Sequence, residues 1–338
     1  MSPKIRIKIV AKNRLEPAQF IGLPCRYPDL EFVLDPAARD YDWFVVYDEL
    51  PRRGGEKLSL NEEVLACPAS NTILLTYEPS SIRYYGRDYT AQFAHVLTSH
   101  EPATLDHPGR HDMPPVGVWY YGGVDDALRH PSPPEKTAQL NTFMSTKQAR
   151  HTLNYRRFVF LEALSRELPE MALFGRDFQP VEKKAEALDP CRYHVAVENH
   201  ISPHHWTEKL SDAFLGYCLP FYAGCPNADD YFPAESFIPL DIDDPSGAAE
   251  IIRRAMADGE YENRLPAIVE ARRRVMEEHN LPNFIGGVVH GPVRQPPAGA
   301  ELDRILSRHR LFRRNPAAVL RYLLGKRRWR RRNVRRWR

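Results

Sequence analysis

The sequence predicts an α/β fold divided into two lobes. Short apolar runs recur along the 338 residues, with helical stretches between several of them, and this pattern is typical of α/β proteins. Apolar residues make up 43% of the chain, enough for the cores of two ordinary domains or of one large α/β unit. The stretch His130–Thr137 carries three prolines in eight residues, so we expect a hinge between the lobes there.

Strands are expected where apolar and β-branched residues cluster. The opening stretch MSPKIRIKIV alternates charged and apolar side chains, which predicts a strand and not the apolar core of a signal peptide. Eight strands are predicted, at Ile5–Val10, Trp43–Tyr47, Thr72–Thr76, Phe93–Leu97, Ala172–Phe174, Tyr193–Val197, Leu219–Tyr222 and Phe237–Leu240. Four helices are predicted, at His151–Glu167, Glu208–Tyr217, Gly247–Asp258 and Tyr261–His279.

Charge is distributed unevenly along the chain. Residues 304–338 contain 15 Lys and Arg and no Asp or Glu, which leaves 32 Lys and Arg against 44 Asp and Glu before them, a formal charge of −12. The sequence therefore predicts an acidic body with a cationic arm. No run of about 18 apolar residues is present to span a bilayer, and five scattered cysteines without Cys-x-x-Cys spacing indicate a reducing compartment. We expect a cytoplasmic protein, soluble or peripheral.

The most informative stretch follows the predicted strand Tyr193–Val197. This strand is apolar on both faces, as central parallel strands are, so Glu198 and Asn199 are expected at the carboxyl edge of the sheet, where α/β proteins bind ligands. Thr207 is a good N-cap for the next helix, and the N–H groups of a helix start bind anions. Lys209 in the first turn opposes the helix dipole unless an anion meets it. The alternative is that Lys209 pairs with nearby carboxylates.

The spacing in this region resembles the signature of the family 10 glycosyltransferases, the α-1,3/4-fucosyltransferases. The match runs for about fifty residues through VEN, TEKL, LPFYAG, YFP and ESFI to LD, with its spacings kept. Weaker similarity covers LLTYEPSSI at 74–82 and NYRRFVFLEAL at 154–164. The resemblance implies a GT-B architecture of two Rossmann-like lobes facing a cleft, to which this chain adds a basic C-terminal helical tail.

The resemblance also implies a role for each lobe. Residues 1–135 are expected to bind the acceptor and residues 136–300 the GDP-sugar. The composition of residues 301–338 separately predicts a basic helical tail. The resemblance further implies a transfer that inverts the anomeric centre, needs no bound metal, and uses the GDP-sugar as co-substrate with no other cofactor.

Individual site residues are implied in the same way. Glu78, just after the strand Thr72–Thr76, matches the proposed general base, and a base on the lobe facing the donor suits an attack opposite the leaving GDP. Lys209 and an arginine near the start of the helix at 151–167 would hold the diphosphate, with Arg157 aligned and Arg156 a close rival, and Glu208 would bind the ribose. The predicted donor-binding residues are Arg157, Lys184, Glu198, Asn199, His205, Glu208 and Lys209.

Three positions depart from the family pattern. His205 replaces a tyrosine, Trp206 a valine, and His200 a serine. They lie near the expected donor site, so another GDP-linked sugar stands as an alternative to fucose.

Two motifs raise a competing hypothesis of a metal site. His194, His200, His204 and His205 are close in sequence, but Pro203 argues against the continuous helix that the spacing of His200 and His204 would need. The run Asp241–Asp244 resembles a metal-binding Asp-x-Asp, and the alternative is that one aspartate caps the next helix.

The tail favours attachment to a membrane. Asn315 and Pro316 predict a helix start, and Val319, Leu320, Leu323 and Leu324 share one apolar face, followed by arginines with two tryptophans. We expect peripheral binding to an anionic membrane surface on its cytoplasmic side. The alternatives are a disordered solubilising tail and a nucleic-acid-binding arm, although no specific nucleic acid is expected because the acidic body would repel it.

The function predicted from these observations is transfer of fucose from GDP-fucose to a cell-surface glycan, such as a lipopolysaccharide or capsule precursor, in α-1,3 type linkage. The alternatives are transfer of another GDP-linked sugar, nucleotide binding without catalysis, and nucleic-acid binding through the tail.

Overall fold

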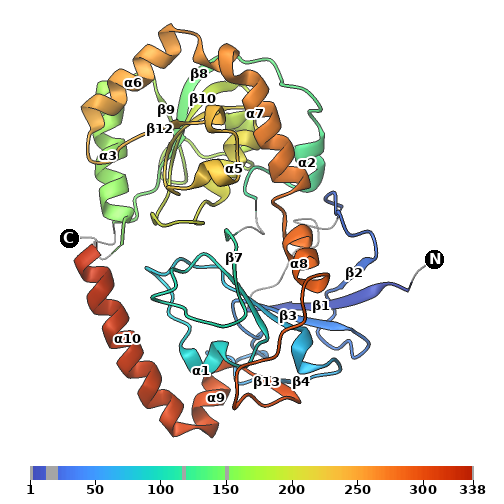
Figure 1. Cartoon of the computed structure of the whole chain (residues 1–338). Coiled ribbons are helices and arrows are strands. Elements are labelled where there is room, and N and C mark those ends of the chain that lie inside the picture. The colour runs from blue at the N-terminus through green and yellow to red at the C-terminus, as the bar shows by residue number, and fades with distance from the viewer. Residues whose placement is uncertain (1–2, 13–21, 116–118, 149–151, 337–338) are drawn as a thin grey trace.

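The protein has two lobes, each built on a parallel β-sheet with helices against its faces (Figure 1). The computed structural model describes residues 3–12, 22–115, 119–148 and 152–336. The two parallel sheets and the cavity between them, described below, agree with the predicted GT-B arrangement.

The first lobe, the N-lobe, contains a six-stranded sheet in the order β2-β1-β3-β5-β6-β7, and every neighbouring pair is parallel. The strands are β1 (Ile5–Ala11), β2 (Leu30–Val33), β3 (Trp43–Tyr47), β5 (Thr72–Leu75), β6 (His95–Thr98) and β7 (Arg110–Asp112). All residues of β3 and β5 are buried, which explains why these segments are continuous apolar runs. The short helix α1 (Arg87–Thr90) lies in this lobe. Helix α2 (Val124–Leu128) contacts both lobes, with Val124 in the core of the first and Ala127 in the core of the second.

The second lobe, the C-lobe, contains a five-stranded parallel sheet in the order β12-β11-β10-β8-β9. The strands are β8 (Ala138–Phe143), β9 (Ala172–Phe174), β10 (Cys191–Val197), β11 (Leu219–Ala223) and β12 (Ile238–Pro239). The central position predicted for the strand before Glu198 is therefore confirmed. Tyr121 and Ala127 already pack in the core of the C-lobe, so the chain enters this lobe before the hinge predicted at His130–Thr137.

Helices cover both faces of the C-lobe sheet. Helices α3 (Asn154–Glu167) and α6 (Pro245–Ala257) pack on the face that carries Val195 and Val197. Helices α5 (Glu208–Leu215) and α7 (Glu260–Glu277) pack on the face that carries Ala196, and α4 (Ala185–Leu188) joins them there.

The chain returns to the N-lobe earlier than the sequence predicted. Helix α8 (Leu281–Val289) buries Leu281, Ile285 and Val288 against the N-lobe strands β1 and β3. The expected extent of the second lobe, to residue 300, therefore runs past the point where the chain returns to the N-lobe, at Leu281. A nine-residue apolar segment with two glycines lacks the charged face that marked the other predicted helices.

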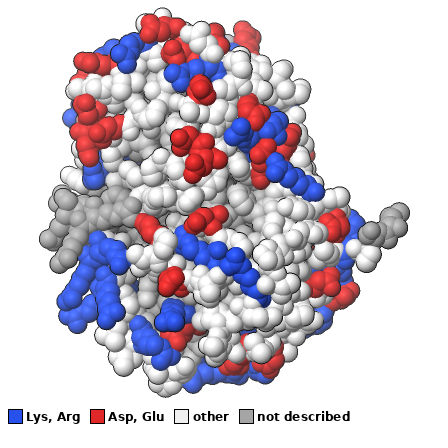
Figure 2. Space-filling model, in the orientation of Figure 1, with Lys and Arg blue, Asp and Glu red and all other residues white. Residues whose placement is uncertain are grey.

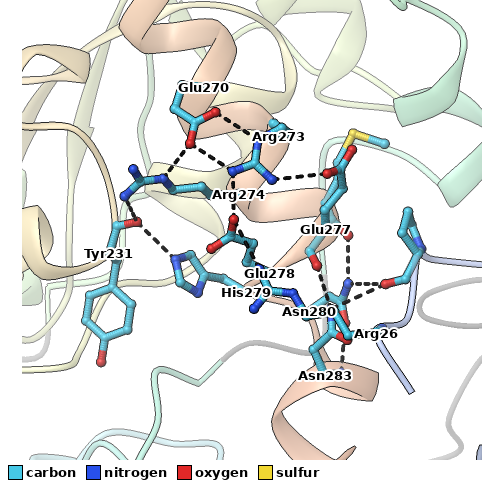
Figure 3. A network of polar contacts seen from close by, with 12 residues as sticks. Arg26, Tyr231, Glu270, Arg273, Arg274, Glu277, Glu278, His279, Asn280 and Asn283 are labelled. Atoms are coloured by element: carbon cyan, nitrogen blue, oxygen red, sulfur yellow. Dashed lines mark hydrogen bonds and ion pairs between the residues drawn. The ribbon is translucent and has the colours of Figure 1, made fainter. Parts of the chain in front are cut away.

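Hydrogen bonds fix the point where α7 gives way to α8 (Figure 3). The Asn280 side chain accepts a hydrogen bond from the Asn283 backbone N–H at 3.0 Å and so caps α8. Its amide nitrogen donates to the carbonyl oxygen of Pro24 at 2.9 Å, and Asn283 accepts from the Arg26 N–H at 2.8 Å. These buried side chains tie the end of the C-lobe helix to the N-lobe.

The tail is an ordered part of the N-lobe. Strand β13 (Arg304–Leu306) pairs antiparallel with β4 (Glu62–Val64), and helices α9 (Arg308–Arg314) and α10 (Pro316–Arg336) follow. The predicted helix start is confirmed, because the Asn315 side chain accepts from the Ala318 N–H at 3.2 Å. The alternative of a disordered tail is therefore wrong for the described residues.

No helix within the described ranges is long and apolar enough to cross a membrane.

Candidate functional site

A cavity of about 450 Å³ lies between the two lobes. The N-lobe contributes the loop after β5, and the C-lobe contributes the starts of α3 and α5 and the loop after β10. Its lining includes six of the eight predicted site residues, namely Glu78, Arg157, Asn199, His205, Glu208 and Lys209. The structure thus brings together residues that are up to 131 positions apart in the sequence.

Glu198 does not line the cavity but holds Thr207, which does. Its side chain is fully buried, with 0% exposed, and its two oxygens accept hydrogen bonds from the Thr207 backbone N–H and hydroxyl, each at 2.7 Å. The Thr207 hydroxyl also accepts from the Lys209 N–H at 3.4 Å, which confirms the predicted N-cap. Two N–H groups of the α5 start are thus satisfied internally, so anion binding depends mainly on cationic side chains.

Lys209 is held between two carboxylates. Its Nζ lies 2.7 Å from Glu208 Oε1 and 3.6 Å from Glu198 Oε2, so the pairing proposed as the alternative for Lys209 is present. Burial lowers the pKa of Lys209, but Glu208 and Glu198 outweigh burial and raise it overall, so the ammonium stays charged. Lys209 also lines the cavity, so it faces any anion bound there.

The two carboxylates beside Lys209 differ in acidity. Burial raises the pKa of Glu208, but Lys209 and then Lys184 overcome this effect and bring it to about 2. Burial raises the pKa of Glu198, and Lys209 only partly offsets the shift. Glu208 is therefore the main counter-charge of Lys209.

The structure distinguishes the two candidate arginines on α3. Arg157 lines the cavity, and its guanidinium donates to the Phe143 carbonyl oxygen at 2.7 Å. Arg156 forms an ion pair with Asp243 on the exposed surface. Arg157 is therefore the arginine placed to meet a bound anion, as aligned from the sequence.

Lys184 lies outside the main cavity. It borders a small void behind the site that Arg157 and Lys209 also line, and its Nζ pairs with Asp212 Oδ2 at 2.8 Å. The geometry therefore places Lys184 away from a donor bound in the main cavity, and not in direct contact with it as predicted. Its charge acts on the site by lowering the pKa of Glu208.

Glu78 faces these cations from the opposite lobe. It follows β5 in a loop without regular secondary structure, and its side chain is half-buried at the cavity wall. Burial raises the pKa of its carboxyl, and Asp48 raises it further, whereas Arg83 lowers it. A carboxylate with a raised pKa has the properties of a general base.

Buried histidines join the lobes behind the cavity. His205 Nδ1 lies 2.9 Å from Ser99 Oγ, and His200 Nε2 lies 3.2 Å from Ser80 Oγ. The two histidine rings pack edge to face, with centroids 5.0 Å apart. Burial lowers the pKa of His205 well below its ordinary value, so it acts as a neutral hydrogen-bonding group.

The two motifs that raised a metal hypothesis have other roles. His194 hydrogen-bonds Asn141 at 2.6 Å and His204 hydrogen-bonds Tyr231 at 2.8 Å, so the four histidines face different partners. Asp244 caps α6 by accepting from the Gly247 N–H at 3.0 Å. Among the described residues, no group of three or more His, Cys, Asp or Glu is arranged to hold a metal ion.

The sequence did not single out several residues that line the cavity. Tyr77 of the N-lobe brings its hydroxyl within 3.3 Å of the hydroxyl of Tyr120, whose backbone N–H donates to Asp212 of the C-lobe. Lys147 and Asn154 also line the C-lobe side. Tyr77 adjoins Glu78 and Asn154 begins α3, so proximity to predicted residues was the one signal that could have found them.

Comparisons with known proteins agree with the sequence resemblance. The mouse (Mus musculus) 4-galactosyl-N-acetylglucosaminide 3-alpha-L-fucosyltransferase 9 is 35% identical over 69 residues, which is 20% of this chain. The Cricetulus griseus protein of the same name is 31% identical over 103 residues, 29% of this chain and 28% of that one. The chain is similar to α1,3-fucosyltransferases. The matched stretch spans about a fifth, 19%, of the mouse protein's length.

The chain also resembles solved structures, at low sequence identity. A crystal structure of an α1,3-fucosyltransferase with GDP-fucose has a TM-score of 0.49 and 12% identity, covering 88% of this chain and 94% of that one. The pneumococcal O-GlcNAc transferase GtfA, in complex with UDP and GlcNAc, has a TM-score of 0.40 and 12% identity, covering 73% of this chain and 57% of that one. No protein-family model matches the chain. The roles of individual residues therefore rest on the geometry of this chain.

Proposed function

We propose that this protein is an inverting glycosyltransferase that transfers fucose from GDP-fucose to a hydroxyl of a glycan. The observation that carries the proposal is the cavity between the lobes, where one carboxylate, Glu78, faces a cationic site formed by Arg157 and Lys209. The similarity to α1,3-fucosyltransferases supports the choice of donor.

The arrangement suits a single displacement across the cavity. Glu78 accepts the proton of the acceptor hydroxyl while that oxygen forms a bond to the anomeric carbon of the sugar. The bond from that carbon to the diphosphate oxygen breaks, and its electron pair leaves with GDP. The added negative charge on the diphosphate is stabilised by Lys209 and Arg157, which the fold places in advance. Because attack and departure take place on opposite faces, the anomeric configuration inverts.

The remaining lining groups fit recognition of the nucleotide and sugar. The Glu208 carboxylate can accept hydrogen bonds from ribose hydroxyls, and Asn199 offers an amide at the same wall. His205 is a neutral ring on this wall where the resembling family has a tyrosine. Another GDP-linked sugar is the alternative donor, since these side chains contact the region expected to hold the sugar.

We further propose that the acceptor is a lipid-linked glycan, such as a lipopolysaccharide or capsule precursor, used at the cytoplasmic face of a membrane. Helix α10 leaves three leucines exposed on its outer side, Leu320, Leu323 and Leu324, with 51–61% of each accessible. Arg327 and Arg331 follow on the same side one and two turns later. Figure 2 shows blue side chains gathered where α10 runs in Figure 1. Each such cation contributes about 1 kcal/mol near an anionic leaflet.

The donor and the linkage are tested with purified protein, EDTA and soluble acceptor glycans. GDP-fucose, other GDP-sugars and UDP-sugars are compared by mass spectrometry of the product, and the linkage is read by NMR. Fucosylation from GDP-fucose in EDTA supports the proposal, whereas activity that needs manganese or a UDP-sugar contradicts it.

Membrane attachment is tested separately by co-sedimentation with vesicles of neutral or anionic lipid. Binding should need anionic lipid, weaken with salt, and fall at least tenfold when the three leucines are replaced by serine. Equal binding of this variant, or no binding of the wild-type chain, would contradict the attachment.

A further inference from the structure

Helix α10 runs beside the N-lobe (Figure 1), and the side chains on one side of it contact that lobe. Tyr322 and Trp329 lie against the Tyr84 ring, with centroids 5.5 and 6.0 Å away, and Arg321 pairs with Asp88 at 2.6 Å. Trp329 is therefore turned toward the protein, opposite the exposed Leu320, and does not serve as the membrane-facing tryptophan that the sequence suggested.

A glycine permits this close packing. A Cβ atom added at Gly325 would lie 2.0 Å from the Tyr84 hydroxyl, so no other residue fits without displacing Tyr84. Glycine inside a helix costs roughly 1 kcal/mol relative to alanine. Its presence in the middle of α10 is explained by the contact that it allows.

Near its C-terminal end, the side of α10 that faces the N-lobe, called here the inward side, contacts the loop that carries Glu78. The Trp329 indole N–H donates to the Ser80 carbonyl oxygen. The Asn333 amide donates to the same oxygen at 3.2 Å and to that of Ser81 at 3.4 Å. Ser80 and Ser81 follow Glu78 by two and three residues, and both are almost completely buried.

These donors complete the support of an irregular segment. The His100 ring donates to the Glu78 carbonyl oxygen at 2.8 Å from within the N-lobe, and His200 of the C-lobe meets the Ser80 hydroxyl. Buried carbonyl groups outside regular structure need donors from elsewhere, and α10 supplies them for Ser80 and Ser81. The loop is thus held on one side by buried histidines and on the other by the tail.

We infer that Trp329 and Asn333 are positioning residues, which hold the backbone after Glu78 so that its carboxylate faces the donor site. This inference rests on the proposed function, in which Glu78 is the base. It gives the tail two sides with different tasks: the inward side orders the catalytic loop and the outward side meets the membrane. A shift of about 1 Å in a positioned group is enough to slow a reaction strongly.

The order of the loop can be measured without activity. The amides of Ile82 and Arg83 both donate to the Pro79 carbonyl oxygen at 2.9 Å, so their hydrogen exchange reports the integrity of this turn. Trp329→Phe removes one donor and keeps an aromatic ring, and Asn333→Ala removes the other. Arg330→Ala, an exposed position on the same helix, serves as the matched control. Gly325→Ala forces Tyr84 and the helix apart without removing either donor.

We expect Trp329→Phe, Asn333→Ala and Gly325→Ala to exchange these two amides at least fivefold faster than the wild type, with the control unchanged. Turnover should fall about tenfold while the affinity for GDP and the KM for the donor stay within twofold, because the cationic site belongs to the other lobe. The acid limb of the rate profile should move to lower pH, since a more solvated Glu78 loses part of its raised pKa.

Unchanged exchange overturns the inference, and so does faster exchange with unchanged turnover and pH profile. If the wild-type chain neither binds GDP nor transfers a sugar, the proposed function fails instead. In that case the exchange rates alone decide whether the tail holds the loop.

Discussion

Replacing Lys209 by alanine should destabilise the protein markedly even without a bound donor. The substitution leaves Glu208 beside Glu198, which is fully buried and has Lys209 as its nearby cation at 3.6 Å. Breaking a buried ion pair costs about 3–5 kcal/mol. The Lys209 and Glu208 side chains keep 18% and 20% of their surface exposed, so we expect the lower end, about 3 kcal/mol.

The assay is urea unfolding of the variant beside Lys147→Ala, which removes an exposed lysine from the wall of the same cavity and should change stability by less than about 0.5 kcal/mol. Adding Glu208→Gln to Lys209→Ala should restore at least about 1 kcal/mol, because it removes a carboxylate that has lost its partner. A loss below about 1 kcal/mol for Lys209→Ala, or no recovery in the double variant, would refute this account of the site.

Three further predictions concern Glu78 and His100 of the N-lobe. Glu78→Gln should lower turnover by about 10² to 10⁴-fold and leave GDP affinity within twofold in calorimetry, and a variant that keeps a tenth of its turnover would rule out Glu78 as base. In the wild type, turnover should fall as the pH drops through the raised pKa of Glu78, above the ordinary value near 4.5, because only the ionised form accepts a proton; an acid limb below pH 4 would contradict the burial of this group. Burial lowers the pKa of His100 to about 4, so between about pH 4 and 6.5 this histidine binds fewer protons in the folded state than in the unfolded state. The free energy of unfolding should therefore fall as the pH drops through this window, and His100 alone should account for a loss of about 1–2 kcal/mol at pH 5. Urea unfolding at pH 7 and 5 checks this, and an equal pH dependence in His100→Gln would show the assignment to be wrong.

Local structural features were predicted correctly from the sequence. The N-cap Thr207, the central strand before Glu198 and the helix start at Asn315 each depend on neighbouring residues, and the structure confirms all three. Trp43–Tyr47 was predicted with the bounds that the structure shows, because a strand buried on both faces is a continuous apolar run. The half-buried edge strand Ala172–Phe174 was also predicted with its observed bounds.

What the sequence did not predict depends on tertiary contacts. Strand β8 reads AQLNTF, with polar residues that pair across the sheet. The edge strand β7 consists of three polar residues, RHD, and the edge strand β2, LEFV, is only four residues long. Helix α8 crosses back to the N-lobe because its apolar side completes that core, which no local pattern specifies. The same limit applies to Trp329, whose partner carbonyl lies 249 residues earlier.

For Glu198, the sequence predicted the position of the residue but not the direction of its side chain. Its place after β10 was predicted correctly, but an acidic side chain at a sheet edge can either enter a cavity or turn back to the next helix. Here it turns back and caps the start of α5 through Thr207. That choice is set by the path of the loop at 199–206, which the sequence alone does not determine.

The most direct test of the central claim is calorimetric titration of the purified chain with GDP, UDP and CMP. The buffer contains EDTA and no urea, and the temperature is one at which Lys209→Ala remains folded. The account predicts that GDP binds selectively and that Lys209→Ala weakens its binding at least tenfold, with Arg156→Ala unchanged because Arg156 pairs with Asp243 away from the cavity. If GDP does not bind, if it binds equally to Lys209→Ala, or if only UDP binds and needs manganese, the cavity between the lobes is not the GDP-sugar site proposed here.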